Sequence, residues 1–275
     1  MYSSILKQNN QNFTMMSNEH QNNNSIHDFD FNLICTYFSS LHRQGPGSDE
    51  TTLQALKHIP TLPAGATVAD LGCGTGTQTL CLARHTQVLI TGLDLFPQFI
   101  DLLNQRSQEE GLSHRLTGIV GDMGQLPFAQ ESLDLIWSEG AIYNIGFNRG
   151  ILAWKPFLKS GGWLAVSEAT WLTDHRPVEI EQFWQDAYPE IDTVEHKLKQ
   201  LEEAGYQHIS HFTLPESCWT DSFYLPQHEA QCLFLERYPN NATAQMLVKN
   251  QRHEAELYQQ YHAFYGYTFF VAQRP

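Results

Sequence analysis

The segment at residues 68–76, with the sequence VADLGCGTG, constrains the fold of this chain more than any other stretch. Its apolar start is typical of a short buried strand, and its three glycines are typical of a tight turn. Glycine readily adopts positive φ angles and lets a ligand come close to the main chain. Residues 77–83 follow with a helical pattern. A strand, a glycine turn and a helix start together predict a nucleotide-binding βα unit.

Two ligand classes fit such a unit. A dinucleotide fingerprint has the form G-x-G-x-x-G, and its third glycine packs the helix against the strand. This chain has Thr77 at that place, and it has Asp70 two residues before Gly72. The string with its leading acid resembles motif I of the class I S-adenosylmethionine-dependent methyltransferases, and within that family the small-molecule methyltransferases of bacterial type. The resemblance covers residues 61–172 and implies S-adenosylmethionine as the cofactor.

The apolar runs agree with the fold that this resemblance implies. That fold is α/β, a doubly wound, seven-stranded, mostly parallel sheet of Rossmann-like methyltransferase type with helical cap insertions. Strands are predicted at residues 67–70, 88–94, 116–120, 133–137, 163–168, 206–214 and 267–272, the last two forming an antiparallel edge. Helices are predicted at residues 30–41, 49–58, 77–85, 99–111, 149–158, 180–187, 194–204, 227–237 and 242–264.

The chain divides by composition. Residues 1–25 are rich in Asn and Gln and lack apolar periodicity, which is typical of a disordered tail. We expect N-terminal cap helices at 26–60 and an S-adenosylmethionine-binding domain at 61–275. Lid insertions are expected at about 173–192 and 215–262, because these segments lie outside the minimal sheet and are rich in large aromatics.

An acid ends the second predicted strand. Asp94 lies 18 residues after Gly76, near the roughly 20-residue spacing at which an acid pairs with ribose hydroxyls. Dinucleotides and S-adenosylmethionine both contain a ribose, so Asp94 supports nucleotide binding without choosing between them. The cofactor-binding residues expected at the first two strand ends are Asp70, Gly72, Cys73, Gly74, Gly76, Asp94 and Leu95.

Further cofactor contacts come from the resemblance. In the family, an acid after the third strand hydrogen-bonds the adenine amino group, and its neighbour packs on the ring. Asp122 and Met123 fit those places. N-terminal helices often cover the cofactor in this family. Arg43, just before a Gly-Pro-Gly turn, is therefore either a contact to the cofactor's carboxylate or a surface charge.

The acceptor side is less defined. Class I methyltransferases catalyse an in-line displacement, in which proximity and alignment supply most of the acceleration. A general base is needed only if the nucleophile starts protonated. Residues 138–141 read Ser-Glu-Gly-Ala where members that methylate nucleobase or glutamine amino groups have Asn/Asp-Pro-Pro-aromatic, which favours a small-molecule acceptor. The candidate catalytic residues at strand ends are Glu139, Tyr143 and His175; alternatively, the aromatics there are lid core.

Charge and cysteine content exclude several classes of partner. The formal net charge is −14, and no cluster of Lys and Arg occurs. We therefore expect neither a nucleic-acid partner nor an anionic membrane surface. The chain lacks an apolar run of the roughly 20 residues that a membrane span needs, and it lacks a signal-peptide pattern. Five cysteines without a C-x-x-C pair favour a reduced, cytoplasmic protein. We expect either a monomer or a homodimer.

No metal site is expected, since the spacing of His208 and His211 places them on opposite sides of a strand. Two rival functions remain open. One is an NAD-dependent oxidoreductase, which Thr77 disfavours. The other is a non-enzymatic protein that binds S-adenosylmethionine without transferring its methyl group.

Overall fold

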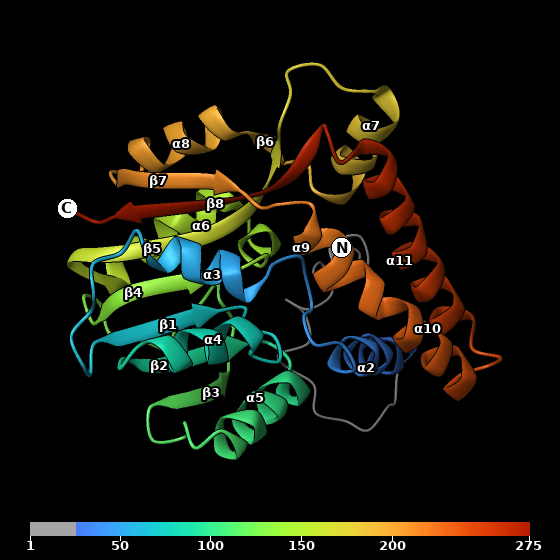
Figure 1. Ribbon diagram of the computed structural model, residues 1–275, viewed down its shortest axis with the longest axis horizontal. Helices are drawn as coiled ribbons and strands as arrows, with labels where there is room; N and C mark the ends of the chain where they lie inside the picture. Colours follow the sequence, from blue (N-terminus) through green and yellow to red (C-terminus); the bar gives the residue numbers. More distant parts are fainter. Residues whose placement is uncertain (1–25) are drawn as a thin grey trace.

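The computed structural model describes residues 26–275, so the tail expected at 1–25 lies outside the described residues. The chain forms one mixed sheet with helices on both faces (Figure 1). The strand order is β3-β2-β1-β4-β5-β8-β7, with β6 paired to the end of β5. The strands are β1 (Thr67–Leu71), β2 (Leu89–Asp94), β3 (Leu116–Val120), β4 (Leu133–Ser138), β5 (Leu158–Trp171), β6 (Asp192–Thr193), β7 (Gln207–Thr213) and β8 (Tyr265–Gln273).

Strand direction confirms the expected mostly parallel sheet. β1 to β5 pair in parallel, whereas β8 runs antiparallel to both β5 and β7. The chain winds outward from β1 in both directions, so the order reverses between β1 and β4. Ligands of open α/β sheets bind beyond the carboxyl ends of the strands at such a switch point. The two-residue β6 is additional to the seven expected strands.

Helices cover both faces because the buried side chains alternate along the strands. Val68, Leu135 and Trp137 face one core, against α3 (Asp49–Leu56), α4 (Thr77–His85) and α5 (Pro97–Glu109). Ala69 and Ile136 face the other core, against α6 (Phe147–Trp154) and α8 (Val194–Glu203). The sheet is thus doubly wound, as the sequence predicts.

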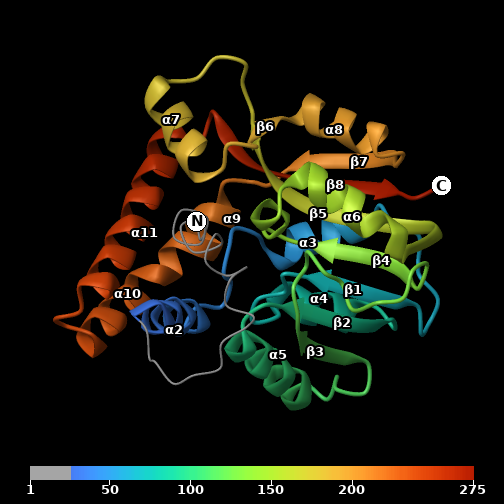
Figure 2. The ribbon, with the colours of Figure 1, turned by 180° about the vertical axis from the view of Figure 1, so that it is seen from behind.

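A second group of helices stands beyond the carboxyl ends of the parallel strands, and both views show it (Figures 1 and 2). In it α2 packs against α5, α10 and α11, and its Leu33 and Tyr37 share a core with Phe99 and Leu247. The group comprises α2 (Ile26–Ser39), α7 (Val178–Ala187), α9 (Ser217–Trp219), the π-helical turn η4 (Thr220–Tyr224), α10 (Leu225–Arg237) and α11 (Ala242–Tyr261).

Local signals explain where elements start and stop. Ser48 caps α3 as expected: its Oγ accepts from the Thr51 amide at 3.2 Å, and the Thr51 Oγ1 accepts from the Ser48 amide at 3.0 Å. The helix predicted to reach residue 158 ends instead at Trp154. A 3₁₀ turn, η3 (Lys155–Phe157), follows, because Pro156 has no amide hydrogen to continue the helix. β5 begins at Leu158, five residues earlier than predicted for its strand (163 − 158).

The prediction for the two histidines of β7 was wrong. The pairing of β7 with β8 shifts register between His208 and Ser210, which is the mark of a β-bulge. An extra residue in a strand reverses the alternation of side chains. His208 and His211 therefore lie on the same side, with Nε2 of the first 3.1 Å from Nδ1 of the second.

Candidate functional site

A cavity of about 740 Å³ lies at the carboxyl edge of the parallel strands. The glycine turn after β1, the ends of β2, β3 and β4, and the loop at residues 43–46 form its walls. Of the residues expected to form the site, the structure brings together Arg43, Gly72, Cys73, Gly74, Asp94, Leu95, Asp122, Met123, Glu139 and Tyr143. Asp70, Gly76 and His175 do not line the cavity.

The Asp94 carboxylate joins the first two strand ends. Its Oδ2 accepts a hydrogen bond from the Gly74 amide at 2.9 Å, and its Oδ1 accepts from the Phe96 amide at 3.1 Å. The Leu95 amide also stabilises the ionised carboxylate, and its two oxygens, with about four lone-pair positions, keep capacity for a further donor. Burial raises the pKa of Asp94 from 3.8 to about 6, although these amides oppose the rise. Asp94 therefore fixes the glycine turn and also lines the cavity.

Asp70 and Gly76 lie behind the turn and support it. Asp70 is fully buried, and its Oδ2 accepts from the Thr79 hydroxyl at 2.6 Å. Burial raises the pKa of Asp70 to about 8. Gly76 has a φ of +89°, and a Cβ added there would come within 2.1 Å of Leu103 Cδ1 on α5. Both residues hold the turn against neighbouring helices.

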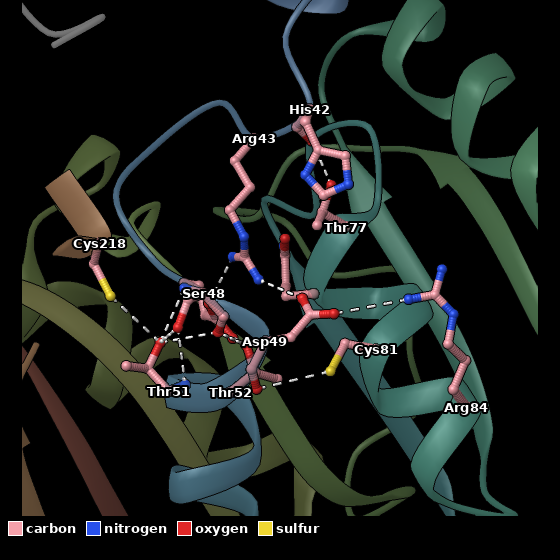
Figure 3. A network of polar contacts seen from close by, with 12 residues as sticks. His42, Arg43, Ser48, Asp49, Thr51, Thr52, Thr77, Cys81, Arg84 and Cys218 are labelled. Carbon is pink, nitrogen blue, oxygen red and sulfur yellow. Dashed lines mark hydrogen bonds and ion pairs between the residues drawn. The ribbon is translucent and has the colours of Figure 1, made fainter. Parts of the chain in front are cut away.

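The loop at residues 42–47 lies on the glycine turn. The Thr77 hydroxyl donates to the His42 carbonyl, and Figure 3 shows these two residues facing each other. The Gln44 Oε1 accepts from the Thr75 amide at 2.9 Å and from its hydroxyl at 3.2 Å. A Cβ at Gly74 would come within 2.5 Å of the same Gln44 oxygen. The sequence reasoning missed Gln44; its only signal was its place beside Arg43.

Arg43 and Glu139 form a buried ion pair at the cavity wall. Arg43 Nη1 lies 3.2 Å from Glu139 Oε2, and Arg43 Nη2 lies 3.1 Å from Asp49 Oδ1, the contact drawn in Figure 3. Glu139 Oε1 also accepts from the Thr52 hydroxyl at 2.6 Å and from Trp137 Nε1 at 3.0 Å. Three donors thus fix the position of this carboxylate. No sequence pattern indicates Thr52 or Trp137 as partners of Glu139.

The wall after β3 combines polar and apolar groups. Asp122 is exposed, and its Oδ1 accepts from the Gly124 amide at 2.7 Å. Trp154 Nε1 on α6 donates to the Met123 carbonyl at 2.8 Å, which fixes this loop. Leu95, 41% exposed, also lines the cavity. A carboxylate beside a thioether and an aliphatic side chain suits a planar heterocycle that carries an amino group.

Two of the candidate catalytic residues have different surroundings. Tyr143, in the 3₁₀ turn η2 (Ile142–Asn144), is buried, and its ring packs edge-on against Tyr188 with centroids 5.9 Å apart. Burial, followed by the charge of Glu254, raises the pKa of the Tyr143 hydroxyl. His175 is exposed in the segment between β5 and α7, and the Thr173 hydroxyl donates to its carbonyl.

No group of three or more His, Cys, Asp or Glu side chains in the described part of the chain is arranged to hold a metal ion. Among residues 26–275, none of the helices combines the length and apolar composition that crossing a lipid bilayer requires.

Comparison with known proteins identifies the core. A family model described as a methyltransferase domain matches residues 68–162. Methyltransferase GfsG of Streptomyces halstedii is 31% identical over 131 residues, which is 47% of each chain. Sarcosine/dimethylglycine N-methyltransferase of Aphanothece halophytica is 31% identical over 116 residues, 42% of each chain. The chain spans about half the length of these curated relatives.

Solved structures show the same fold over most of the described chain. A methyltransferase from Geobacter sulfurreducens, in complex with S-adenosyl-L-homocysteine, superposes with a TM-score of 0.76 at 20% identity, covering 89% of this chain and 98% of that one. YjhP from E. coli superposes with a TM-score of 0.77 at 23% identity, covering 88% and 99%. Residues 68–162 therefore match a methyltransferase domain, and the sheet order is that of the Rossmann-like methyltransferase fold.

Proposed function

We propose that this protein transfers the methyl group of S-adenosylmethionine to a small-molecule acceptor. The observation that carries the proposal is the series of acids and glycines along one cavity, with Asp94 and Asp122 at successive strand ends. The methyl donor supplies an activated sulfonium carbon and a neutral leaving group. The protein then has to bind both molecules, align them and keep water out.

The residues present fit the methyl donor. Asp94 can accept from the ribose hydroxyls, because its carboxylate lines the cavity and keeps acceptor capacity beyond the amides that it already binds. Asp122 can accept from the adenine amino group, with Met123 and Leu95 against the ring. Gly72 lines the cavity, and a side chain is excluded there because a Cβ would lie 2.4 Å from that of Ala141. Arg43 remains the candidate contact for the donor's carboxylate.

The same geometry disfavours the NAD alternative. A dinucleotide places its pyrophosphate on the amides at the helix N-terminus that follows the glycine turn. Here the Gln44 side chain already accepts from the Thr75 amide, and the His42 carbonyl accepts from the Thr77 hydroxyl. Two acceptor oxygens thus lie where the phosphate oxygens would have to bind, and like partial charges repel.

Several properties support a small-molecule acceptor in a reducing compartment. The net charge of −14 opposes binding to nucleic acid. The five cysteines are all unpaired, and four of them are buried, as in cytoplasmic proteins. A monomer or homodimer is consistent with these features. The sterol, glycine-derived and malonyl acceptors named in the curated relatives are also small molecules or small carried groups.

We also propose that the cap helices form a lid over the acceptor. The segments at 26–48, 173–192 and 215–262 supply α2, α7, α9, α10 and α11, which stand beyond the strand ends. Ligand-bound lids exclude water and become ordered. Hydrogen exchange should slow more in these segments than in the sheet when both ligands bind. Protection confined to the glycine turn, Asp94 and Asp122 would contradict the lid.

Calorimetry tests the proposed function. S-adenosylhomocysteine should bind the purified chain, and NAD should not. Gln44→Ala frees the Thr75 amide and should bind NAD more tightly than the unmutated chain does, because the oxygen that excludes the pyrophosphate is removed. A protein that binds NAD more tightly than S-adenosylhomocysteine would overturn the proposal. A chain that binds S-adenosylhomocysteine but methylates nothing in a broad acceptor panel would instead favour a non-enzymatic binding protein.

A further inference from the structure

Two histidines of the edge strand β7 lie apart from the cavity and have no part in the proposed methyl transfer. His208 and His211 are not among the residues that line the cavity. Within the described part of the chain, β7 pairs with β8 on one side and forms the end of the sheet on the other. Both histidines are exposed. A dissolved ion can therefore reach their ring nitrogens from the solvent.

The β-bulge in β7 brings the two rings to one face of the sheet. The pairing with β8 shifts register between His208 and Ser210, and the extra residue reverses the alternation of side chains. Contacts on the two faces agree with this arrangement. His211 stacks on Phe270, which belongs to the core under α6 and α8, with ring centroids 6.3 Å apart. Ser210 instead contacts His58, just after α3 on the opposite face, with its Oγ 3.3 Å from Nε2.

The distance between the two rings suits chelation of one metal ion. Nε2 of His208 lies 3.1 Å from Nδ1 of His211. Imidazole nitrogens bind zinc and similar ions at about 2.0–2.1 Å. Two such bonds at octahedral or tetrahedral angles place their nitrogens about 2.9–3.4 Å apart. The strand therefore already holds the two nitrogens at a chelating distance.

Neighbouring groups hold the two rings in this orientation. The His211 ring stacks on Phe270 with 24° between the planes, and Phe270, 1% exposed, is fixed by core packing. The backbone of Ser210 hydrogen-bonds the His208 ring. Because Nε2 of His208 faces His211, this bond uses Nδ1 and leaves Nε2 directed at the shared space. Metal-binding histidines use their second ring nitrogen in this way.

A hydrogen bond between the two rings accounts for part of this geometry. In the neutral pair one facing nitrogen donates and the other accepts. The ring that donates can move its proton to its second nitrogen, because neutral imidazole has two tautomers. Both facing nitrogens then carry lone pairs, and a divalent ion between them replaces the hydrogen bond. The hydrogen bond alone stabilises an exposed pair little, since water offers each ring a comparable partner.

The ligand set limits the kind of ion. Two imidazoles favour divalent transition metals such as Ni²⁺, Cu²⁺ and Zn²⁺, whereas Mg²⁺ and Ca²⁺ require oxygen ligands. Structural zinc sites have four protein ligands. Over residues 26–275, no group of three or more His, Cys, Asp or Glu is arranged around one point. Water must therefore fill the remaining coordination positions of an ion bound here.

We propose that His208 and His211 form a two-histidine site that binds one divalent transition-metal ion at the edge of the sheet. The ion joins two residues across the bulge and so stabilises β7 along its unpaired side. The site is separate from the cavity, so this inference is independent of the proposed methyltransferase function.

Calorimetry tests the site on the purified, untagged full chain after removal of metal with a chelator. Ni²⁺, Zn²⁺ and Mg²⁺ are titrated separately. We expect Ni²⁺ and Zn²⁺ to bind in the micromolar range and Mg²⁺ not to bind at millimolar concentration. Electron paramagnetic resonance with less than one equivalent of Cu²⁺ should show two nitrogen ligands. Absence of Ni²⁺ and Zn²⁺ binding at millimolar concentration, or copper spectra with one nitrogen ligand, would overturn the proposal.

Histidine variants locate the ion. His208→Asn and His211→Asn should each weaken Ni²⁺ binding about tenfold or more, because the remaining imidazole loses its intramolecular second ligand. His228→Asn is the matched control, since His228 is an exposed histidine of α10, and it should bind Ni²⁺ like the unmutated chain. Unchanged melting temperatures without metal show that the variants fold. Unchanged Ni²⁺ affinity in both β7 variants, or an equal loss in His228→Asn, would refute the site.

Discussion

Acidification should weaken cofactor binding through one residue, Asp94. Burial raises its pKa to about 6 in the ligand-free protein. The carboxylate is therefore about nine tenths ionised at pH 7 and about one tenth ionised at pH 5. If the ribose hydroxyls donate to Asp94, they prefer the ionised form, because hydrogen bonds to charged groups are the stronger ones. S-adenosylhomocysteine should then bind about tenfold more weakly at pH 5 than at pH 7.

The magnitude has an upper limit that the structure also sets. A protonated Asp94 still offers acceptor capacity, so binding is weakened and not abolished. The difference between a hydrogen bond to a charged group and one to a neutral group is about 1 kcal/mol. Two ribose hydroxyls therefore lose at most about 2 kcal/mol, or about thirtyfold in affinity. The affinity should level off at low pH and not fall indefinitely.

Folding stability gives a second measurement with the opposite sign. The folded-state pKa of Asp94 lies above its ordinary value of 3.8. Between pH 4 and pH 6 the unfolded chain releases this proton before the folded chain does. As the pH rises through that interval, the free energy of unfolding should therefore fall by about 3 kcal/mol from this group alone. Above pH 6 it should stay level. The difference in free energy of unfolding between the unmutated protein and Asp94→Asn, measured across this pH range, separates the contribution of Asp94 from those of other titratable groups.

Calorimetry between pH 5 and pH 8 is the assay, with S-adenosylhomocysteine as the ligand. Asp94→Asn should bind more weakly at pH 7 and lose the dependence on pH. Asp122→Asn, which alters the other cavity carboxylate, should keep that dependence. An affinity that is constant from pH 8 to pH 5 in the unmutated protein would refute the assignment of Asp94 to the ribose. A pH dependence retained in Asp94→Asn would do the same.

Two further predictions distinguish residues that hold the structure of the site from residues that take part in the reaction. Gly76→Ala and Gly65→Ala both place a side chain at positive φ, +89° and +81°, but only at Gly76 does the new Cβ meet an atom within 4 Å. Measured by urea unfolding, Gly65→Ala should lower the free energy of unfolding by about 1–2 kcal/mol, and Gly76→Ala should lower it by about 2–5 kcal/mol. Equal losses would contradict the inference that Gly76 is required by its packing against Leu103. Glu139→Gln should destabilise the fold by about 1.5–3 kcal/mol but leave kcat with a saturating acceptor within about tenfold, because three donors already occupy this carboxylate. A fall in kcat of about 10² or more would restore Glu139 as a general base.

The strand-end residues that line the cavity could be predicted because their signals are local. An apolar run followed by an acid or a glycine turn fixes where a parallel strand ends, and parallel strands end at one edge of the sheet. Asp94, Asp122 and the turn glycines follow from that rule without knowledge of the packing. Ser48 as a helix cap also depends only on its neighbours. These interactions are specified within a few residues of sequence.

The residues that the sequence did not predict depend on contacts between distant segments. Gln44 reaches Thr75 across 31 positions, and Thr52 reaches Glu139 across 87. No periodicity encodes such pairs. His175 illustrates the converse, since its place after a strand suggested the site, yet β5 continues to Trp171 and carries the following segment past the cavity. A single bulge likewise reversed the expected relation of His208 and His211.

The ligand class of a glycine turn is therefore set largely outside the turn. A threonine in place of the third dinucleotide glycine is a weak argument alone, because close helix packing can be achieved by other means. Here Gly76 already supplies that packing against Leu103, one position earlier. The stronger argument is that the loop at 42–47 places the Gln44 oxygen on the Thr75 amide, which a pyrophosphate would require. The N-terminal segment thus selects against one nucleotide class while the strand-end acids remain available to the other.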